Sequence, residues 1–130
     1  MALTISQLDG NKHANRIPEL EAILQQPQAN QLSGFWLAHP EAHHPGIALL
    51  VNGDLANLYY FPNEGPPTRV SKGPAPGLDP NGTTLFSHGS PEQAQQILNT
   101  QVIPFSLAVT VAKEFFTSKD LPKSIEWLEL

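Results

Sequence analysis

The sequence has no cysteine, a single methionine and no long run of apolar residues. Without cysteine the chain has no disulfide, no thiolate nucleophile and no cysteine-type zinc site, and a reducing compartment is the simplest setting for it. No stretch reaches the 18 apolar residues that a membrane-spanning helix needs. Residues 1–8 lack the cationic and apolar regions of a secretory signal. We therefore expect a cytoplasmic protein without a membrane anchor.

Basic residues are also scarce. Seven Lys and Arg face twelve Asp and Glu, which leaves a net charge of -5. Nucleic-acid-binding proteins usually cluster positive charge to displace counterions, whereas the cations here are scattered along the chain. Direct contact with nucleic acid is therefore not expected, while a basic protein partner is compatible with the acidic balance.

The length of 130 residues and the 40% hydrophobic content fit one domain over residues 1–130 with a core of its own. Two helices are predicted. Residues 17–26 place apolar side chains on one face, with Pro18 in the first turn. Residues 104–117 are apolar around most of the circumference, so this helix should be buried across a sheet. For residues 89–103 the pattern leaves two options open, a helical turn over 92–98 or an extended segment over 97–103.

The centre of the sequence predicts a β-hairpin, because Asn-Gly between two apolar runs is a strong turn signal. Residues 47–51 and 55–61 form its strands. One face carries Ile47, Leu49, Val51, Ala56, Leu58 and Tyr60, and it is the face expected to pack on a helix. The other carries Ala48, Leu50, Asn57, Tyr59 and Phe61. Shorter strands are predicted near 3–8, 35–37, 83–88 and 124–130.

Residues 62–82 include ten Pro or Gly among 21 positions, which predicts a long surface loop without regular structure. The expected fold class is therefore α+β. It combines a mostly antiparallel sheet with one long buried helix over residues 104–117 and a shorter N-terminal helix over residues 17–26.

Three histidines, His39, His43 and His44, lie in the loop after the first central strand, but their spacing matches no regular metal-ligand pattern. His39-Pro40-Glu41 resembles half of the deaminase zinc signature, and the cysteines of the other half are missing. No nucleophile elbow or phosphate-binding loop is present. We expect no catalytic residue, cofactor or metal. A small enzyme or ligand-binding domain that uses this histidine loop is the alternative hypothesis.

Several motifs resemble a known family. They are Phe35-Trp36-Leu37 with His39-Pro40-Glu41, the segment 50–56 leading to Tyr60-Phe61, Val102-Ile103-Pro104, Glu114-Phe115-Phe116, and Leu121-Pro122 followed by Ile125-Glu126-Trp127. This ordered set, over residues 33–130, is similar to the first-numbered immunity-protein family of bacterial polymorphic toxin systems. The resemblance implies an α+β protein that binds and neutralises a cognate toxin, often a nucleic-acid deaminase. Trp127 matches the tryptophan characteristic of that family.

Under this hypothesis the partner is a toxin with a basic substrate groove, which exposed acidic and aromatic residues would contact. The predicted contact residues are Asp54, Asn57, Tyr59, Glu64 and Asp79. Large aromatic residues expected to be structural are Trp36, Phe105, Phe116 and Trp127. An adaptor of the same fold, unrelated to toxins, is a further alternative, and the sequence leaves the oligomeric state open.

Overall fold

The computed structural model describes residues 3–7, 10–25, 32–40, 44–63, 68–87, 94–118 and 120–129. Its elements in chain order are β1 (Leu3–Gln7), β2 (Gly10–Ala14), α1 (Ile17–Leu24), β3 (Leu32–Ala38), β4 (Gly46–Asn52), β5 (Leu55–Phe61), β6 (Arg69–Ser71), β7 (Thr83–Phe86), β8 (Gln95–Leu98), a 3-10 turn (Asn99–Gln101), β9 (Ile103–Pro104), α2 (Phe105–Ser118) and β10 (Trp127–Glu129). The predicted α+β class is confirmed.

The strands build one large antiparallel sheet in the order β10-β6-β5-β4-β3-β1-β2, with β9 paired to the start of β5. The predicted hairpin forms its centre, because Asn52 lies opposite Leu55 and Ile47 lies opposite Tyr60. Gly53 occupies the turn with a φ of 58°, a left-handed conformation that favours glycine. The strands β7 and β8 form a separate two-stranded sheet, called here the β7–β8 ribbon.

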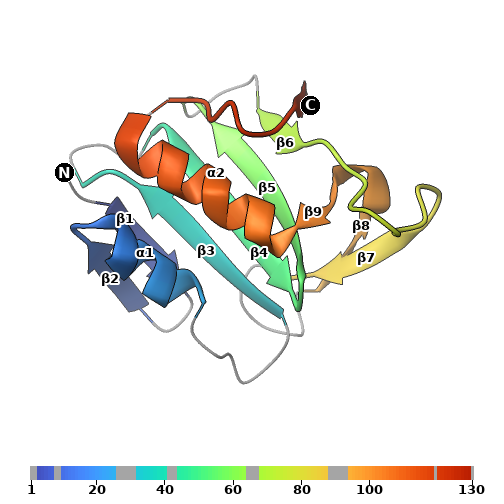
Figure 1. Ribbon diagram of the computed structural model, residues 1–130, viewed down its shortest axis with the longest axis horizontal. Helices are drawn as coiled ribbons and strands as arrows, with labels where there is room; N and C mark the ends of the chain where they lie inside the picture. The colour runs from blue at the N-terminus through green and yellow to red at the C-terminus, as the bar shows by residue number, and fades with distance from the viewer. Residues whose placement is uncertain are drawn as a thin grey trace.

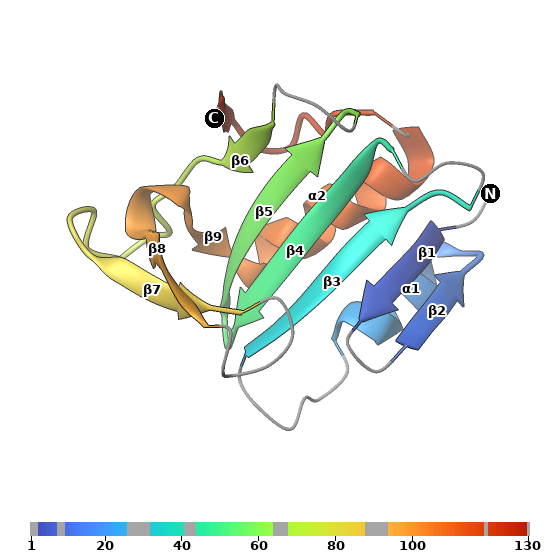
Figure 2. The ribbon, with the colours of Figure 1, turned by 180° about the vertical axis from the view of Figure 1, so that it is seen from behind.

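Both helices cover the same face of the large sheet. They lie in front of it in Figure 1 and behind it in Figure 2. The two helices contact each other, and Lys113 Nζ of α2 lies 2.8 Å from Glu21 Oε1 of α1. One face of β4 and β5 is therefore directed at α2, as the alternation of residues in the hairpin predicts.

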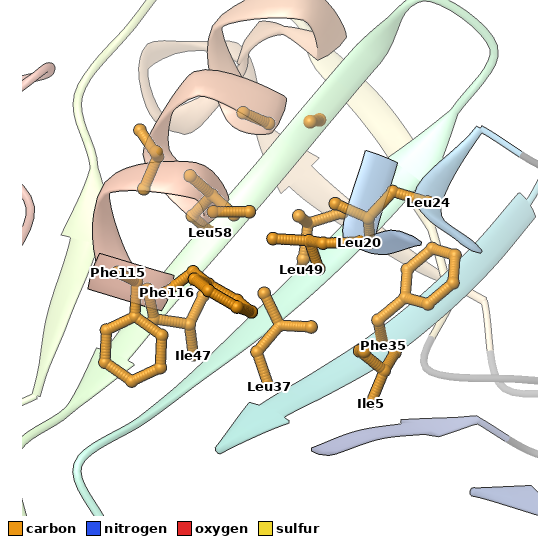
Figure 3. Packing of buried hydrophobic residues seen from close by; sticks show 14 of the residues in the cluster. Ile5, Leu20, Leu24, Phe35, Leu37, Ile47, Leu49, Leu58, Phe115 and Phe116 are labelled. Carbon is orange, nitrogen blue, oxygen red and sulfur yellow. The ribbon is translucent and has the colours of Figure 1, made fainter. Parts of the chain in front are cut away.

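The helix-side core contains every residue of the hairpin face predicted to pack on a helix: Ile47, Leu49, Val51, Ala56, Leu58 and Tyr60. Figure 3 shows side chains of this core from β1, β3, β4, β5 and both helices meeting between the sheet and α2. Phe115 of α2 is fully buried here, and Leu20 and Leu24 bury the inner side of α1. Burial of α2 against the sheet is thus confirmed.

Three predictions of secondary structure need correction. The segment 62–82 is not free of regular structure, because β6 pairs with both β5 and β10 and its Val70 and Ser71 are fully buried. A strand of three residues is too short to show alternation among so many prolines and glycines. The strand β2, paired with β1, was not predicted. Of the two options for 89–103, the helical turn over 92–98 is wrong where the structure describes it, because Gln95–Leu98 is a strand, and the extended segment over 97–103 is interrupted by the 3-10 turn Asn99–Gln101.

The remaining boundaries shift by a few residues. The helix predicted over 104–117 spans Phe105–Ser118, and the one predicted over 17–26 ends at Leu24. The C-terminal strand is limited to Trp127–Glu129. Within the described ranges, none of the helices combines the length and apolar character required to cross a membrane.

Candidate binding surface

The β7–β8 ribbon packs on the face of the large sheet that the helices leave uncovered. Leu50 of β4, Phe86 of β7 and Val102 form a second buried cluster there. The half-buried residues around it are Leu55, Tyr59, Leu78 and Ile97. This cluster explains why Leu50, on the hairpin face expected to be less apolar, is only 3% exposed.

A network of buried polar groups fastens the chain beside the ribbon to the sheet. The Ser71 hydroxyl donates to Gln101 O at 2.7 Å and accepts from Leu58 N at 3.1 Å. Asn57 Nδ2 donates to the same Gln101 carbonyl at 2.9 Å. Two residues after Ser71, Gly73 N donates to Thr100 O at 2.7 Å. Buried polar groups that share partners in this way hold two segments in one arrangement.

Asn57 must therefore be removed from the predicted contact residues. Its side chain is fully buried, and its amide is bonded within the chain. Its Oδ1 has no hydrogen-bond partner among the described residues. Alternation along β5 placed Asn57 correctly on the face opposite α2, but only the packing of segment 99–102 over that face buries it.

The two faces of the ribbon differ in character. The pairs Thr84–Ile97 and Phe86–Gln95 alternate with Thr83–Leu98 and Leu85–Gln96. Phe86 and Ile97 turn towards the large sheet, so the second set of pairs faces outward. Leu85 is 38% exposed and Leu98 is 57% exposed, and they are the exposed large hydrophobic residues of the described chain. The outer face of the ribbon is defined here as Thr83, Leu85, Gln96 and Leu98.

An acidic residue lies in each turn next to the ribbon. Asp54 is exposed in the β4–β5 turn, and the neighbouring Asn52 Nδ2 donates to Leu85 O at 2.9 Å. Asp79 is exposed in the loop before β7, where Asn99 Nδ2 donates to its backbone carbonyl at 2.8 Å. Residues 52–55, 76–87 and 94–101 contain no Lys or Arg. The charged residues of these three stretches are therefore Asp54 and Asp79, both negative.

Elsewhere the charges are largely compensated. The described ion pairs are Arg16–Glu19, Arg69–Glu129, Lys72–Glu126 and Lys113–Glu21. Every side chain in these pairs is at least a third exposed, so each pair contributes little to stability. Their effect on the surface potential is larger, because they cancel four carboxylates, whereas Asp54 and Asp79, like Asp120, have no cationic partner among the described residues.

The structure separates two of the three histidines of the alternative hypothesis. His39 is buried on the helix side, where its ring lies 5.1 Å from that of Phe115 and its Nε2 lies 3.3 Å from Phe116 O. His44 lies on the opposite face, with its ring 5.9 Å from Trp36. His39 and His44 therefore cannot line one site, and His43 is outside the described residues. Among the residues that are described, no three potential ligands are grouped for a metal ion.

Tyr59, expected to be exposed, is half-buried on the ribbon side, and burial raises the pKa of its hydroxyl. Its ring lies 6.4 Å from Phe61, and Phe61 lies 5.4 Å from Trp36. These rings form a half-exposed aromatic row on the face opposite the helices. Trp36 thus packs on the face opposite the helix-side core. Glu64 lies outside the described residues.

The other aromatic residues expected to be structural pack on the helix side. Phe116 is buried in that core, and Phe105 and Trp127 are half-buried against it. Trp127 Nε1 donates to Pro122 O at 2.7 Å, and its ring lies 6.1 Å from Tyr60. The hydrogen bond holds Trp127 against the segment after α2 and the ring contact packs it against β5, while β10 itself joins the sheet by pairing with β6.

Leu85 and Leu98 were missed as surface residues by sequence reasoning. The strand over 83–88 was predicted, but its partner was not, and without the pairing neither face of the ribbon can be assigned. The run Thr83-Thr84-Leu85-Phe86 shows no alternation of polar and apolar residues, so the sequence offered no signal for the outward face.

No family model matches the sequence, and no curated protein matches it.

Proposed function

We propose that this chain is an immunity protein that acts in the cytoplasm by binding a toxin and covering the groove in which the toxin holds its substrate. The observation that carries the proposal is the acidic character of the turns beside the ribbon, where Asp54 and Asp79 are exposed and residues 52–55, 76–87 and 94–101 contain no Lys or Arg. The similarity of residues 33–130 to an immunity-protein family supports the same partner class.

Toxins that act on nucleic acids need a positive substrate groove, because phosphate neutralisation supplies much of their affinity. An acidic surface is attracted to such a groove over about a Debye length, roughly 8 Å at physiological salt. Steering of this kind raises association rates by about 10- to 1,000-fold in favourable cases and falls steeply as salt increases. The chain would then inhibit by occupying space and needs no reaction of its own.

The test uses the protein encoded by the gene beside this one, which the proposal predicts to be the toxin. We expect cells that express the toxin to survive only when this chain is co-expressed, and the two purified proteins to form a complex that abolishes toxin activity. Equal killing with and without the chain would refute the proposal. Binding without protection would instead favour the adaptor hypothesis.

The exposed Asp54 and Asp79 allow a test of the role of charge. Asp54→Asn with Asp79→Asn should slow association with the toxin by about fivefold at low salt, with a weaker dependence on ionic strength. The matched control is Glu126→Gln with Glu129→Gln, which removes the same formal charge from residues paired with Lys72 and Arg69. If both double variants slow association equally, net charge alone matters and the acidic turns have no special role.

A further inference from the structure

We infer that the outer face of the β7–β8 ribbon is the apolar centre of the contact with the basic protein partner, with Leu85 and Leu98 as its anchors. The inference rests on the proposed function and adds to it a contact surface that sequence reasoning did not identify. The proposed partner of this surface is a protein with positive charge around an apolar depression.

The first argument is the shape and exposure of the ribbon. In Figures 1 and 2 the β7–β8 ribbon lies beside β5, at the end of the molecule away from α1 and β2. Leu98 and Leu85 point away from the second buried cluster, and 57% and 38% of their surfaces are exposed. Two neighbouring strands thus present two large aliphatic side chains on one face, diagonal to each other in the ladder, and contiguous exposed apolar side chains are a feature of interaction sites.

The second argument is that the ribbon is held in place before any partner binds. Phe86, only 1% exposed, anchors β7 in the buried cluster. The side chain of Asn52 binds the β7 backbone, and Asn99 N donates to Gly82 O at 3.0 Å to close the other end. On the outer face the Thr83 hydroxyl donates to Gln96 Oε1 at 2.6 Å. A preformed surface loses little conformational entropy on binding, which favours affinity.

The third argument is the charge around the apolar pair. Protein interfaces commonly have an apolar centre with few charges and a polar or charged rim. Here the four outer residues are uncharged, and Asp54 and Asp79 lie in the turns at either end. Two copies of this chain that paired through the ribbon would bring like charges together. A basic partner would bring opposite charges together, so the charge pattern favours the toxin over a second copy.

The experiment measures affinity for the toxin from the neighbouring gene, carrying a substitution that abolishes its activity. We expect Leu98→Ser and Leu85→Ser each to weaken binding by about 10-fold, and the double variant by about 100-fold or more. Both positions are exposed, so thermal unfolding should change little. Leu128→Ser on β10, a half-buried residue of the large sheet outside the ribbon, is the control and should bind within about twofold of the wild type.

Three outcomes separate the hypotheses. If the wild-type chain binds the toxin and the double variant binds within twofold of it, the inferred surface is wrong while the proposed function stands. If the wild-type chain does not bind at all, the proposed function itself fails. If sedimentation shows a dimer of the wild-type chain that Leu98→Ser abolishes, the ribbon is a self-contact and the inference is overturned.

Hydrogen exchange gives a second measurement that needs no variant. Backbone amides of Thr83–Phe86 and Gln95–Leu98 should exchange more slowly in the toxin complex than in the free chain. Amides of β1 and β2, at the far edge of the sheet, should not change. Protection confined to β1 and β2 would contradict the inference.

Discussion

Replacing Gly73 with alanine is expected to be the most damaging single-methyl change in the segment that supports the ribbon. A Cβ atom at Gly73 would lie 2.0 Å from Val102 O and 2.9 Å from Val102 C. Carbon and oxygen atoms in contact are normally more than 3 Å apart, so one of the two backbones must move by about 1 Å. Neither can move freely, because Gly73 N donates to Thr100 O at 2.7 Å and Gln101 O accepts from Ser71 and Asn57.

The cost follows from two contributions. Forcing an additional methyl into a close-packed site costs about 1–3 kcal/mol, and losing a backbone hydrogen bond costs about 0.5–1.5 kcal/mol. We therefore expect Gly73→Ala to lower the free energy of unfolding by about 2–4 kcal/mol. For a chain of this length that corresponds to a decrease in Tm of roughly 10 °C. Urea unfolding followed by far-ultraviolet circular dichroism measures the first quantity, and a thermal scan measures the second.

Gly77→Ala is the matched control, because Gly77 lies in the same loop. Its φ is 82°, but a Cβ there would meet nothing within 4 Å. Its cost should be only the backbone strain of a left-handed alanine, about 1 kcal/mol. If Gly73→Ala costs no more than Gly77→Ala, then the close approach of Gly73 to Val102 does not constrain the fold and the reasoning is refuted.

Three further predictions concern buried or bonded polar groups. His39→Phe should preserve the contact with Phe115 but lose the hydrogen bond to the Phe116 carbonyl, which lowers the free energy of unfolding by about 1 kcal/mol in urea titrations; an unchanged midpoint would contradict this. At Glu114, burial acts to raise the pKa, but hydrogen bonds from Ser124 and the backbone at Lys123 outweigh it and lower the pKa below its ordinary value of 4.5. Stability supplied by the Glu114 carboxylate is therefore complete above about pH 5 and is lost as pH falls through the lowered pKa, so Glu114→Gln should flatten the acid limb of a stability–pH curve; parallel curves would refute it. Asn57→Asp should destabilise the chain by more than about 2 kcal/mol at pH 7, because it buries a carboxylate without a cation; a small effect would show that Asn57 is accessible to water.

Much of the helix-side fold was predictable because its signals are local. The Asn-Gly turn and the alternation of 47–51 and 55–61 defined the hairpin, its register parity and the face that meets α2. The apolar circumference of 104–117 required burial on most sides. Each of these patterns depends on residues within a few positions of one another, and the structure confirms them.

The proposed contact surface was predictable only in part. Asp54 and Asp79 were identified from turn positions, and both are exposed. Asn57 was expected to be a contact residue but is buried, and Leu85 and Leu98 were not identified as exposed. The exposure of all three depends on how segment 83–102 returns to the sheet. The pairing of β7 with β8 spans a loop whose length and turn chemistry do not define a register.

The sequence by itself determined the secondary structure of the central hairpin and of α2, the shortage of positive charge and the lack of thiol chemistry, since these follow from composition and short-range periodicity. Only the tertiary structure decided that β6 is buried between β5 and β10, that His39 and His44 lie on opposite faces, and that the ribbon exposes two leucines between two aspartates. Such features arise where segments distant in the chain compete for the same face of a sheet, and free energy of packing, summed over contacts that no local pattern contains, selects the result.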